Sequence, residues 1–448
     1  MEVKEYIHEM AVKARAAAAE LRKLSTEEKN AILMKIADAL DAEKTAIFAA
    51  NAEDVAAAKD RGISAALVDR LTLTDARFKS MVDGVRYVAS LPDPVGETIW
   101  TRERPSGITI RKTREPFGVV AVVFESRPNV FIDTAALCLK TGNAIILRGG
   151  KEAIKSNSAL AKVVAKALRE CGSRSEELGV KEDQDLNNPS LHTPHSSLHT
   201  SFSAAVQFVE ILEHEAVSEM VRAVGLIDVA IPRGGERLIR AMCEAALIPV
   251  LKHYKGVCHV YVDDKADMSM ALSILDNAKR QRPSACNAAE CLLVHEKLAP
   301  MFMPMVEAWA KGESVVLHTP ENEEEIGNGE RGTGNGEELW STEFLALEMN
   351  VGIVKDYREA IAHINRYGSH HSDCIVTADE ARAKEFLRDV DSACVYHNVS
   401  TRFTDGAEFG MGAEIGISTD KLHARGPMGL EELTTYKYTI TGDGVIRK

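Results

Sequence analysis

The segment Pro116–Gly150 reads PFGVVAVVFESRPNVFIDTAALCLKTGNAIILRGG, and it decides the fold class. Its first part, Val119–Phe124, is a continuous apolar run of the kind found in parallel strands that are buried on both faces. A helical pattern follows at Val130–Lys140, and a second apolar run, Ala144–Leu147, comes after a tight turn. Strand, helix and strand in this order predict an α/β fold with a parallel sheet, whose ligands bind beyond the carboxyl ends of its strands.

The alternation of strand and helix continues after residue 203. Further strands are predicted at 221–231, 259–262, 291–294, 373–377 and 393–396. Helical patterns lie at 156–171, 268–279, 298–309, 356–367 and 379–387. Residues 3–89 are helical in pattern too, and no motif with a chemical role stands out in them. The α/β architecture is therefore expected to follow a helical lead-in.

A charged hairpin is predicted before the first buried strand, over Thr101–Thr113, with its turn at Arg104–Gly107. The alternating segment Leu433–Ile440 near the end of the chain is expected to pair with it. Exposed ribbons of this kind form oligomer contacts by pairing their edges. The pattern therefore predicts a homo-oligomer that is at least a dimer.

Composition excludes several classes of partner. A net charge of −13 over 448 residues argues against nucleic acid or an anionic membrane, because both require a basic surface. An acidic protein that binds an anionic substrate needs a local basic pocket instead. Eight cysteines without paired spacing, no membrane-length apolar run and a polar N-terminus predict a reduced, cytoplasmic protein of two or three domains.

Two polar stretches interrupt the α/β pattern. In Ser173–Ser203 the sequence Ser190–Thr193 nearly repeats as Ser197–Thr200, and its histidines, His192, His195 and His199, are interpreted as part of a surface insertion. The glutamate- and glycine-rich segment Glu321–Glu338 predicts a loop. We expect no metal site in the chain.

A candidate nucleophile lies in Arg280–Glu290, which reads RQRPSACNAAE and precedes the apolar run Cys291–Val294. Thiolates form near neutral pH in a positive, partly exposed setting, and Lys279, Arg280 and Arg282 lie just before Cys286. A buried, inert cysteine beside solvated charges is the commoner arrangement for such a residue taken alone. The rest of the chain has to decide between the two interpretations.

Two strand-to-glycine turns offer open backbone amides together with a cation. They lie at Arg148–Lys151 and at Arg233–Gly235, where an anionic pyrophosphate or 2′-phosphate could rest. The usual dinucleotide fingerprint is missing, because the glycines of Gly410–Gly416 follow no buried strand. Each turn alone is more often only a tight turn.

Motifs spread over the whole chain match a known family. The Pro116–Val120 and Thr141–Asn143 segments, the Gly234–Gly235 pair and Cys286 resemble the aldehyde dehydrogenase superfamily in order and spacing. Longer blocks are similar to the γ-glutamyl phosphate reductase family within it: ESRPNV (125–130), IPRGG (231–235), PSACNAAE (283–290), NVSTRFTDG (398–406) and HARGPMGLE (423–431). The resemblance runs from near the N-terminus to the last strand and omits the two polar stretches.

The resemblance implies a reaction: NADPH reduces L-glutamyl 5-phosphate to L-glutamate 5-semialdehyde and phosphate leaves, as the second step of proline biosynthesis. Cys286 attacks the acyl phosphate and forms a thioester, which hydride then reduces. Donors to the developing oxyanion are the backbone amide of Cys286 and a side-chain amide, Asn129 or, as a weaker candidate, Asn287.

One departure from the superfamily concerns the residues that activate water. Hydrolytic members carry a Glu-Leu-Gly-Gly-Lys segment before the cysteine, whereas the matching place here, Leu251–Gly256, reads LKHYKG. Without that carboxylate, water is poorly activated and the thioester survives for reduction. Lys252, His253 and Lys255 bring positive charge to the phosphate; His253 is a candidate catalytic residue, with a structural hydrogen-bonding role as an equal alternative.

The resemblance also implies cofactor and substrate contacts. Gly234 and Gly235 would hold the pyrophosphate, and Glu343 the nicotinamide ribose. The turn formed by Arg148, Gly149 and Lys151 would bind the adenosine ribose, and its two cations favour NADP(H) over NAD. Candidates for the substrate's carboxylate and phosphate are Arg127, Arg402 and Arg425, with structural ion pairs as the alternative for the last two.

The resemblance predicts an aldehyde dehydrogenase-like fold in three parts. Residues 1–230 form the helical lead-in and NADP-binding domain, with the hairpin 101–115 and a return at 398–430. Residues 231–397 form the catalytic domain, and 431–448 the last strand of the oligomerisation element. The alternatives are a hydrolytic or CoA-linked relative, or a silent partner of a glutamate kinase. Because the sequence begins at the reductase, we expect a transient complex with a separate glutamate 5-kinase.

Overall fold

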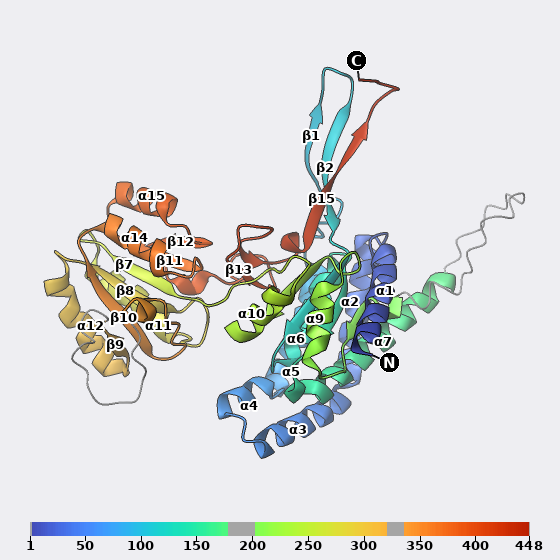
Figure 1. Ribbon diagram of the computed structural model, residues 1–448, viewed down its shortest axis with the longest axis horizontal. Helices are drawn as coiled ribbons and strands as arrows, with labels where there is room; N and C mark the ends of the chain where they lie inside the picture. The colour runs from blue at the N-terminus through green and yellow to red at the C-terminus, as the bar shows by residue number, and fades with distance from the viewer. Residues whose placement is uncertain (1, 178–201, 320–335, 448) are drawn as a thin grey trace, which may run out of the picture. The chain divides into compact units, whose positions relative to one another are not determined.

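The computed structural model describes residues 2–177, 202–319 and 336–447 (Figure 1). The chain forms two compact units, and each is described by itself. The first comprises Met1–Leu251, Met411–Gly416 and Met428–Lys448, and the second Lys252–Gly410 and Ile417–Pro427. The histidines at 192, 195 and 199 lie outside the described residues, as does most of the predicted loop 321–338. Among the described residues, no helix is both long and apolar enough to cross a membrane.

The first unit is built on a four-stranded parallel sheet of order β5-β4-β3-β6. Its strands are β3 (Val119–Phe124), β4 (Ala144–Arg148), β5 (Val206–Phe208) and β6 (Val229–Arg233). All residues of β3 and β4 are buried, which confirms the two strands predicted from the continuous apolar runs. The strand predicted at 221–231 is wrong in its first part: Val221 and Arg222 are the last two residues of helix α9 (His214–Arg222), whose buried residues recur at helical spacing.

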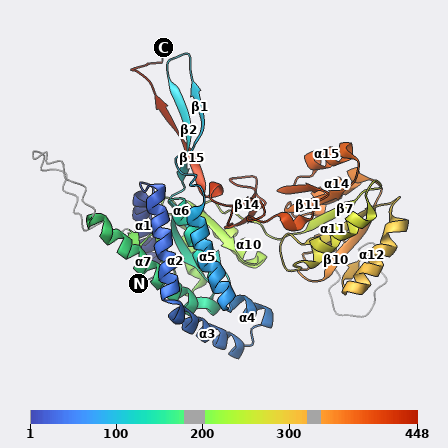
Figure 2. The same cartoon turned by 180° about the vertical axis from the view of Figure 1, so that it is seen from behind.

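The helices of this unit pack on the sheet or, like α3 and α4, on other helices (Figure 2). They are α1 (Val3–Leu21), α2 (Thr26–Ala42), α3 (Lys44–Asp60), α4 (Ala65–Leu71), α5 (Asp75–Ser90), α6 (Pro128–Lys140), α7 (Ile154–Glu177), α9 and α10 (Glu236–Ala245). The helical lead-in is confirmed, and Ser25 caps α2 through a capping box with Glu28. Helix α7 continues past Gly172, where the sequence pattern predicted its end.

The first unit extends further along the chain than the sequence-based division at residue 230. That division falls inside β6, a strand of the sheet, whereas the compact unit continues to Leu251. The backbone explains the difference, because Val250 bridges Ala230 and the amide of Leu251 donates to the carbonyl of Ala230. The segment after α10 is thereby attached to β6.

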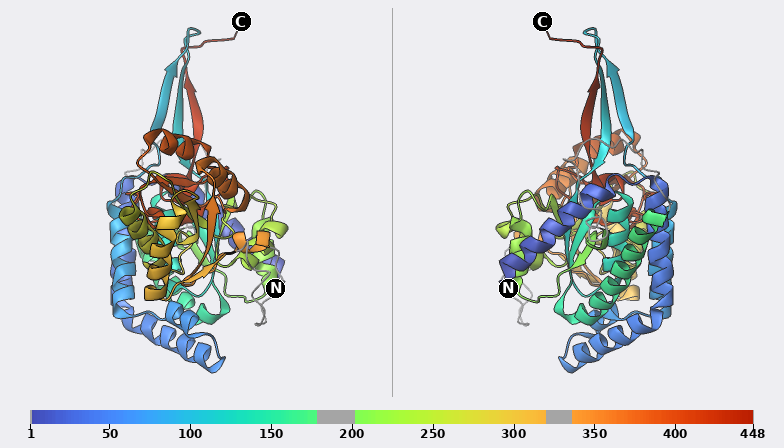
Figure 3. Two further views of the ribbon diagram at one scale, coloured as in Figure 1. Left: turned by 90° about the vertical axis from the view of Figure 1, so that its left-hand side faces the viewer. Right: turned by 90° about the vertical axis from the view of Figure 1, so that its right-hand side faces the viewer.

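A three-stranded antiparallel arm projects from the first unit (Figures 1 and 3). Its order is β1 (Thr98–Glu103), β2 (Thr109–Pro116) and β15 (Thr434–Thr441). The predicted pairing of the last strand with the hairpin is confirmed, since β15 pairs with β2 along its whole length, from Thr434 opposite Pro116 to Thr441 opposite Thr109. Both outer strands leave one edge without a partner in the described chain.

The second unit contains a six-stranded parallel sheet of order β12-β11-β7-β8-β10-β9. Its strands are β7 (Cys258–Val262), β8 (Ala289–His295), β9 (Val316–His318), β10 (Glu348–Val354), β11 (Ser372–Val376) and β12 (Cys394–His397). Helices α11 (Met268–Arg280) and α12 (Ala299–Glu313) cover one face, and α14 (Tyr357–Tyr367) and α15 (Glu380–Asp389) cover the other. Short α13 (Gly336–Trp340) replaces the end of the predicted loop.

Every strand of this sheet has its carboxyl end at one edge, and the loop before β8 carries Cys286 at the opposite, amino-terminal edge. The chain passes between the two units at four places, two of them in the short strands β13 (Gly416–Ser418) and β14 (Gly426–Met428). The segments that begin at Lys252 and Ile417 both belong to the second unit, and both contribute to the candidate site.

Candidate active site

The Cys286 loop is held by a backbone contact that only glycine permits. A Cβ atom on Gly256 would lie 1.8 Å from the carbonyl oxygen of Cys286. The same carbonyl accepts a hydrogen bond from the Cys258 thiol, at 3.3 Å. The Lys252–Gly256 segment therefore lies directly against the loop that positions the half-buried Cys286.

A buried ion pair closes this loop at its base. Lys279, in the last turn of α11, and Glu290, at the start of β8, are both fully buried and lie 2.8 Å apart. The other oxygen of Glu290 accepts the backbone N–H of Leu345 at 3.3 Å. Burial raises the pKa of Glu290 to about 7, and Lys279 opposes that rise. Lys279 thus fixes the two ends of the loop relative to each other.

The cations upstream of Cys286 are engaged elsewhere. Besides the Lys279 pair, Arg280 forms ion pairs with Asp276 at 2.6 Å and Glu313 at 2.5 Å. The suggestion that Lys279 and Arg280 activate the thiol is therefore not supported by their contacts. The acid–base groups beside Cys286 come from other segments.

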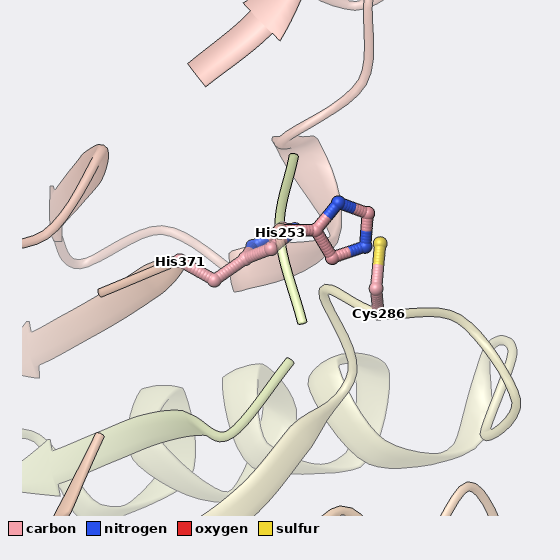
Figure 4. Close-up of side chains that lie close together, drawn as sticks. All are labelled: His253, Cys286 and His371. Atoms are coloured by element: carbon pink, nitrogen blue, oxygen red, sulfur yellow. The ribbon is translucent and has the colours of Figure 1, made fainter. Parts of the chain in front are cut away.

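Two histidines accompany the thiol (Figure 4). Ligating atoms of His253, His371 and Cys286 all lie within 4.8 Å of one another, and the His253 ring lies beside the sulfur. His253 Nδ1 donates to the carbonyl of Ile417 at 2.8 Å, so in the neutral ring Nε2 carries the lone pair. The hydrogen bond thereby sets the tautomer that can accept a proton.

His371 was missed by the sequence reasoning. It is fully buried just before β11, and burial, with a smaller effect of His253, lowers its pKa to about 3, so it is neutral. Its Nδ1 lies 2.8 Å from the Ser372 hydroxyl. The His371 and His253 rings meet edge to face, with their centroids 5.6 Å apart. The only sequence signal was a His370-His371 pair ahead of a predicted strand.

Glu343, in the segment before β10, contacts the Lys252–Gly256 segment that lies against the Cys286 loop. Its Oε1 accepts the backbone N–H of Gly256 at 2.9 Å. The two lysines of the Lys252–Gly256 segment already have partners. Lys252 pairs with Asp420 at 2.9 Å, and Lys255 donates to the carbonyl of Ser341 at 2.6 Å. The positive charge expected from Lys252 is therefore largely offset.

Arg402 and Asn287 also belong to this neighbourhood. Asn287 directs its amide N–H groups to the carbonyls of Thr404, at 2.8 Å, and Arg402, at 3.4 Å. This commitment weakens Asn287 as an oxyanion donor. Arg402 donates to Gln281 at 2.8 Å, and burial followed by Arg282 lowers its pKa, while Cys286 acts in the opposite sense.

Arg425 is an ion-pair residue in this structure. Its guanidinium lies 3.0 Å from the Asp391 carboxylate and also donates to the Asp391 carbonyl at 2.9 Å. Of the predicted site residues in the second unit, Cys286, His253, Glu343 and Arg402 thus surround one loop, and Arg425 is held by Asp391.

Comparison with known proteins found relatives that match this chain over nearly its whole length. The aldehyde dehydrogenase family model matches residues 2–173. The γ-glutamyl phosphate reductase of Carboxydothermus hydrogenoformans is 48% identical over 439 residues, which cover 98% of each chain. The crystal structure of γ-glutamyl phosphate reductase from Thermotoga maritima is 40% identical, covers 99% of this chain and 100% of its own, and superimposes with a TM-score of 0.87.

The chain belongs to the γ-glutamyl phosphate reductase family. It is accordingly an oxidoreductase of the aldehyde dehydrogenase type, with the fold expected from the sequence, and it acts in proline biosynthesis. The fold is shared more widely: a glyceraldehyde-3-phosphate dehydrogenase from Methanocaldococcus jannaschii, solved in complex with NADP, is 16% identical with a TM-score of 0.63, and each chain covers at least 95% of the other.

A γ-glutamyl phosphate reductase needs a place for a nicotinamide cofactor, and the turn after β6 fits its pyrophosphate. Gly235 caps α10 with ordinary extended backbone (φ −72°), and a Cβ there would meet nothing within 4 Å. Helix α10 begins directly after this residue, and a helix N-terminus favours an anion. Gly234 is different, because a Cβ there would come 2.7 Å from Glu125.

The second glycine turn, after β4, is more closely packed than the turn after β6. Arg148 is buried and donates to the carbonyls of Gly149, at 3.1 Å, and Leu212, at 3.0 Å. Gly149 packs against Asn157, and the exposed cation of the turn is Lys151. In the same unit, Asn129 donates to Asp133 at 2.9 Å, and Arg127 precedes α6 as its N-cap.

Proposed function

We propose that the chain reduces L-glutamyl 5-phosphate to L-glutamate 5-semialdehyde with NADPH, through a thioester on Cys286. The observation that carries the proposal is the half-buried thiol beside an imidazole whose tautomer is fixed by the Ile417 carbonyl. A thiol paired with such a base forms the nucleophile needed for acyl transfer. Relatives named γ-glutamyl phosphate reductase supply the substrate class.

In the first step His253 takes the proton of the Cys286 thiol at Nε2, and the sulfur attacks the carbonyl carbon of the acyl phosphate. The bond between that carbon and the phosphate oxygen breaks, phosphate leaves, and a thioester remains. NADPH, when bound by the residues proposed below, would supply hydride to this carbonyl, which thereby becomes a thiohemiacetal oxyanion. When the oxyanion collapses, the carbon–sulfur bond breaks, which releases the aldehyde and regenerates the thiolate.

The thioester is protected from hydrolysis because the Lys252–Gly256 segment lacks a carboxylate that could activate water. Residues 252–256 contribute no carboxylate, and of the two acids bonded to that segment, Asp420 pairs with Lys252 and Glu343 accepts the Gly256 amide with one oxygen. A water molecule beside the thioester therefore has no carboxylate base from this segment. This arrangement favours reduction, or attack by phosphate in reverse, over hydrolysis.

The reverse direction tests the proposal. Glutamate semialdehyde, in equilibrium with pyrroline-5-carboxylate, should reduce NADP only when phosphate or arsenate is present, and NADP should give a higher kcat/KM than NAD. The rate is followed by absorbance of the reduced nucleotide. Reduction without phosphate would support a hydrolytic enzyme, reduction that requires coenzyme A would support a CoA-linked one, and no reduction would support a silent partner protein.

For the cofactor we propose the contacts implied by family resemblance: Gly234 and Gly235 at the pyrophosphate, Arg148, Gly149 and Lys151 at the adenosine ribose, and Glu343 at the nicotinamide ribose. Lys151, as the exposed cation of its turn, supplies most of the attraction for a 2′-phosphate. The NADP bound by the archaeal structural neighbour agrees with this preference. Equal kcat/KM for NAD and NADP would contradict it.

Gly235→Ala is expected to raise the KM for NADPH about tenfold or more, because the added methyl group occupies the space where the pyrophosphate approaches the backbone. Its backbone angles suit alanine, and the methyl group meets no protein atom within 4 Å. The melting temperature and the kcat at saturating NADPH should therefore stay unchanged. An unaltered KM would place the pyrophosphate elsewhere.

For the substrate we propose Arg127 and Arg402 as partners of the phosphate and α-carboxylate, Arg425 as a further candidate, and Asn129 as the oxyanion donor. Arg402 has the strongest support, because its half-buried guanidinium lies close enough to Cys286 for the thiol to influence its pKa. Replacement of Arg402 by glutamine should raise the KM for the semialdehyde more than that for NADP. The reverse pattern would assign Arg402 to the cofactor.

We further propose that the arm makes the protein a homo-oligomer. Strand β15 exposes Tyr436, Tyr438 and Ile440, the last with 58% of its surface accessible, beside an edge open to pairing. Ile440→Asp should lower the molar mass in solution, as measured by light scattering. Ile446→Asp, which lies beyond the strand and is 80% exposed, is the control that should leave the mass unchanged.

Because acyl phosphates hydrolyse readily, we also propose a transient complex with a glutamate 5-kinase. In a coupled assay with such a kinase, hydroxylamine should intercept the intermediate poorly if it passes directly between the enzymes. Trapping at the level of free acyl phosphate would count against the complex.

A further inference from the structure

The second unit contains a thiol and two imidazoles that the reaction does not use. Cys291 on β8 and His259 on β7 are fully buried, and His363 lies on α14, which covers the same face of the sheet. One ligating atom from each residue lies within 4.8 Å of the other two. The cluster is separate from the His253, Cys286 and His371 group of the active site.

Strand register brings these residues together. His259 on β7 is paired directly with Cys291 on β8, so their side chains leave the sheet on the same face. On the other side of β7, His259 is paired with Asp373 of β11. The ring of His363 meets the Trp340 ring at 4.6 Å and the Tyr367 ring at 4.8 Å, and these contacts hold it above the strands.

The hydrogen bonds leave an unmet requirement at this cluster. His259 Nδ1 bonds to the Asp373 carboxylate at 3.0 Å, whereas its Nε2 is buried without a hydrogen-bond partner in the described chain. His363 Nε2 is buried and unpartnered as well. Leaving two imidazole nitrogens unsatisfied beside a thiol is costly, because buried polar groups are almost always paired.

We propose that His259, Cys291 and His363 form a binding site for a thiophilic divalent cation, represented by Zn²⁺. Two imidazole nitrogens and one thiolate are the ligands that zinc prefers, and a carboxylate bonded to the far nitrogen of a ligating histidine is the usual supporting partner. Three atoms no more than 4.8 Å apart share a point within about 2.8 Å of each, so side-chain shifts under ~1 Å reach zinc bond lengths of ~2.0–2.3 Å.

A third group of possible metal ligands in the described chain consists of Asp263, Asp264 and His295, and it is not a candidate metal site. In it, Arg382 lies 2.9 Å from the Asp263 carboxylate and also pairs with Asp264, so a cation already occupies the carboxylates facing His295. At the Cys291 cluster, by contrast, the ion pair found among the described residues joins His259 to Asp373 and involves no lysine or arginine. Metal binding there would join β7, β8 and α14 and stabilise the second unit without a role in the reaction.

Cobalt titration of the reduced full-length protein tests the proposal, because a thiolate bound to Co²⁺ gives a near-ultraviolet charge-transfer band. We expect about one equivalent to bind in wild type and in Cys286→Ser, which removes the thiol of the active-site cluster. The band should be absent in Cys291→Ser. Zn²⁺ should displace the cobalt and raise the melting temperature of wild type and Cys286→Ser only.

Cys291 is buried, so its replacement can disturb folding. His363→Gln therefore serves as the second variant, because His363 is only half-buried, and circular dichroism checks that this variant is folded. It should weaken Co²⁺ binding at least tenfold and leave the phosphate-dependent reduction of NADP unchanged. No band in wild type, an unaltered affinity in His363→Gln, or a band lost in Cys286→Ser and kept in Cys291→Ser would each overturn the proposal. The last result would place the metal at the active site.

Discussion

Cys286→Ala is expected to lower the kcat for phosphate-dependent reduction of NADP by roughly 10⁴-fold or more, since no covalent intermediate can form without the sulfur. The KM for NADP should change little, because the cofactor contacts proposed above lie on other residues. Initial rates at saturating semialdehyde and phosphate measure the effect. In wild type without phosphate, mass spectrometry should detect the glutamyl adduct on the peptide that contains Cys286.

Cys243→Ser is the matched control, because Cys243 is also a half-buried free cysteine but lies on α10 of the first unit. It should retain wild-type rates and give the same adduct on Cys286. Comparable rates for Cys286→Ala and wild type would sink the thioester mechanism. An adduct on a different cysteine would assign the nucleophile to that residue.

Gly256→Ala should lower kcat roughly 10²-fold without an equal change in KM, because the methyl group cannot be accommodated against the backbone of the Cys286 loop. A Cβ there would stand 1.8 Å from the Cys286 carbonyl oxygen and 2.9 Å from its Cα, so the loop has to move by about an ångström or more. Steady-state kinetics together with alkylation rates of Cys286 measure the displacement.

The control for this substitution is Gly312→Ala on helix α12, where a Cβ meets nothing within 4 Å. It should preserve activity and, because Gly312 lies in the last turn of α12, raise stability by no more than about 0.5–1 kcal/mol, the gain expected in a helix interior. If Gly256→Ala merely unfolds the protein, its melting temperature will show this. A folded Gly256→Ala enzyme with wild-type kcat would refute the role assigned to the close approach.

The sequence was informative where a local pattern has one structural solution. Continuous apolar runs such as Val119–Phe124 occur in strands buried on both faces, and the hairpin carried its own turn residues. The strand predicted at 221–231 was wrong in part because the segment is largely apolar throughout. Its first two residues end helix α9, and only the residues from Val229 onward belong to strand β6. Apolar content alone did not distinguish a helix end from a strand.

The candidate site was less accessible, because its partners are distant in sequence. Cys286 was identified from the surrounding block, but His371 joins it only through the fold, and no spacing rule connects the two. Lys279 was considered either as an activator of the thiol or as a solvated charge, whereas it is fully buried against Glu290. The open position of Gly235 and the carbonyl contacts of Arg148 likewise depend on packing that a linear pattern does not contain.

The arm has a consequence for biosynthesis on the ribosome. Strand β2 can pair with β1 as soon as both have been synthesised, but its other partner, β15 (Thr434–Thr441), follows far later in the sequence. While the intervening residues are being translated, β2 is therefore an open edge, at which another nascent chain can pair. Arg111, Lys112 and Arg114 in β2 carry like charges that repel the same strand of a second chain. Strand β15, which is synthesised long after β2, thus completes the arm and removes this opportunity for premature association.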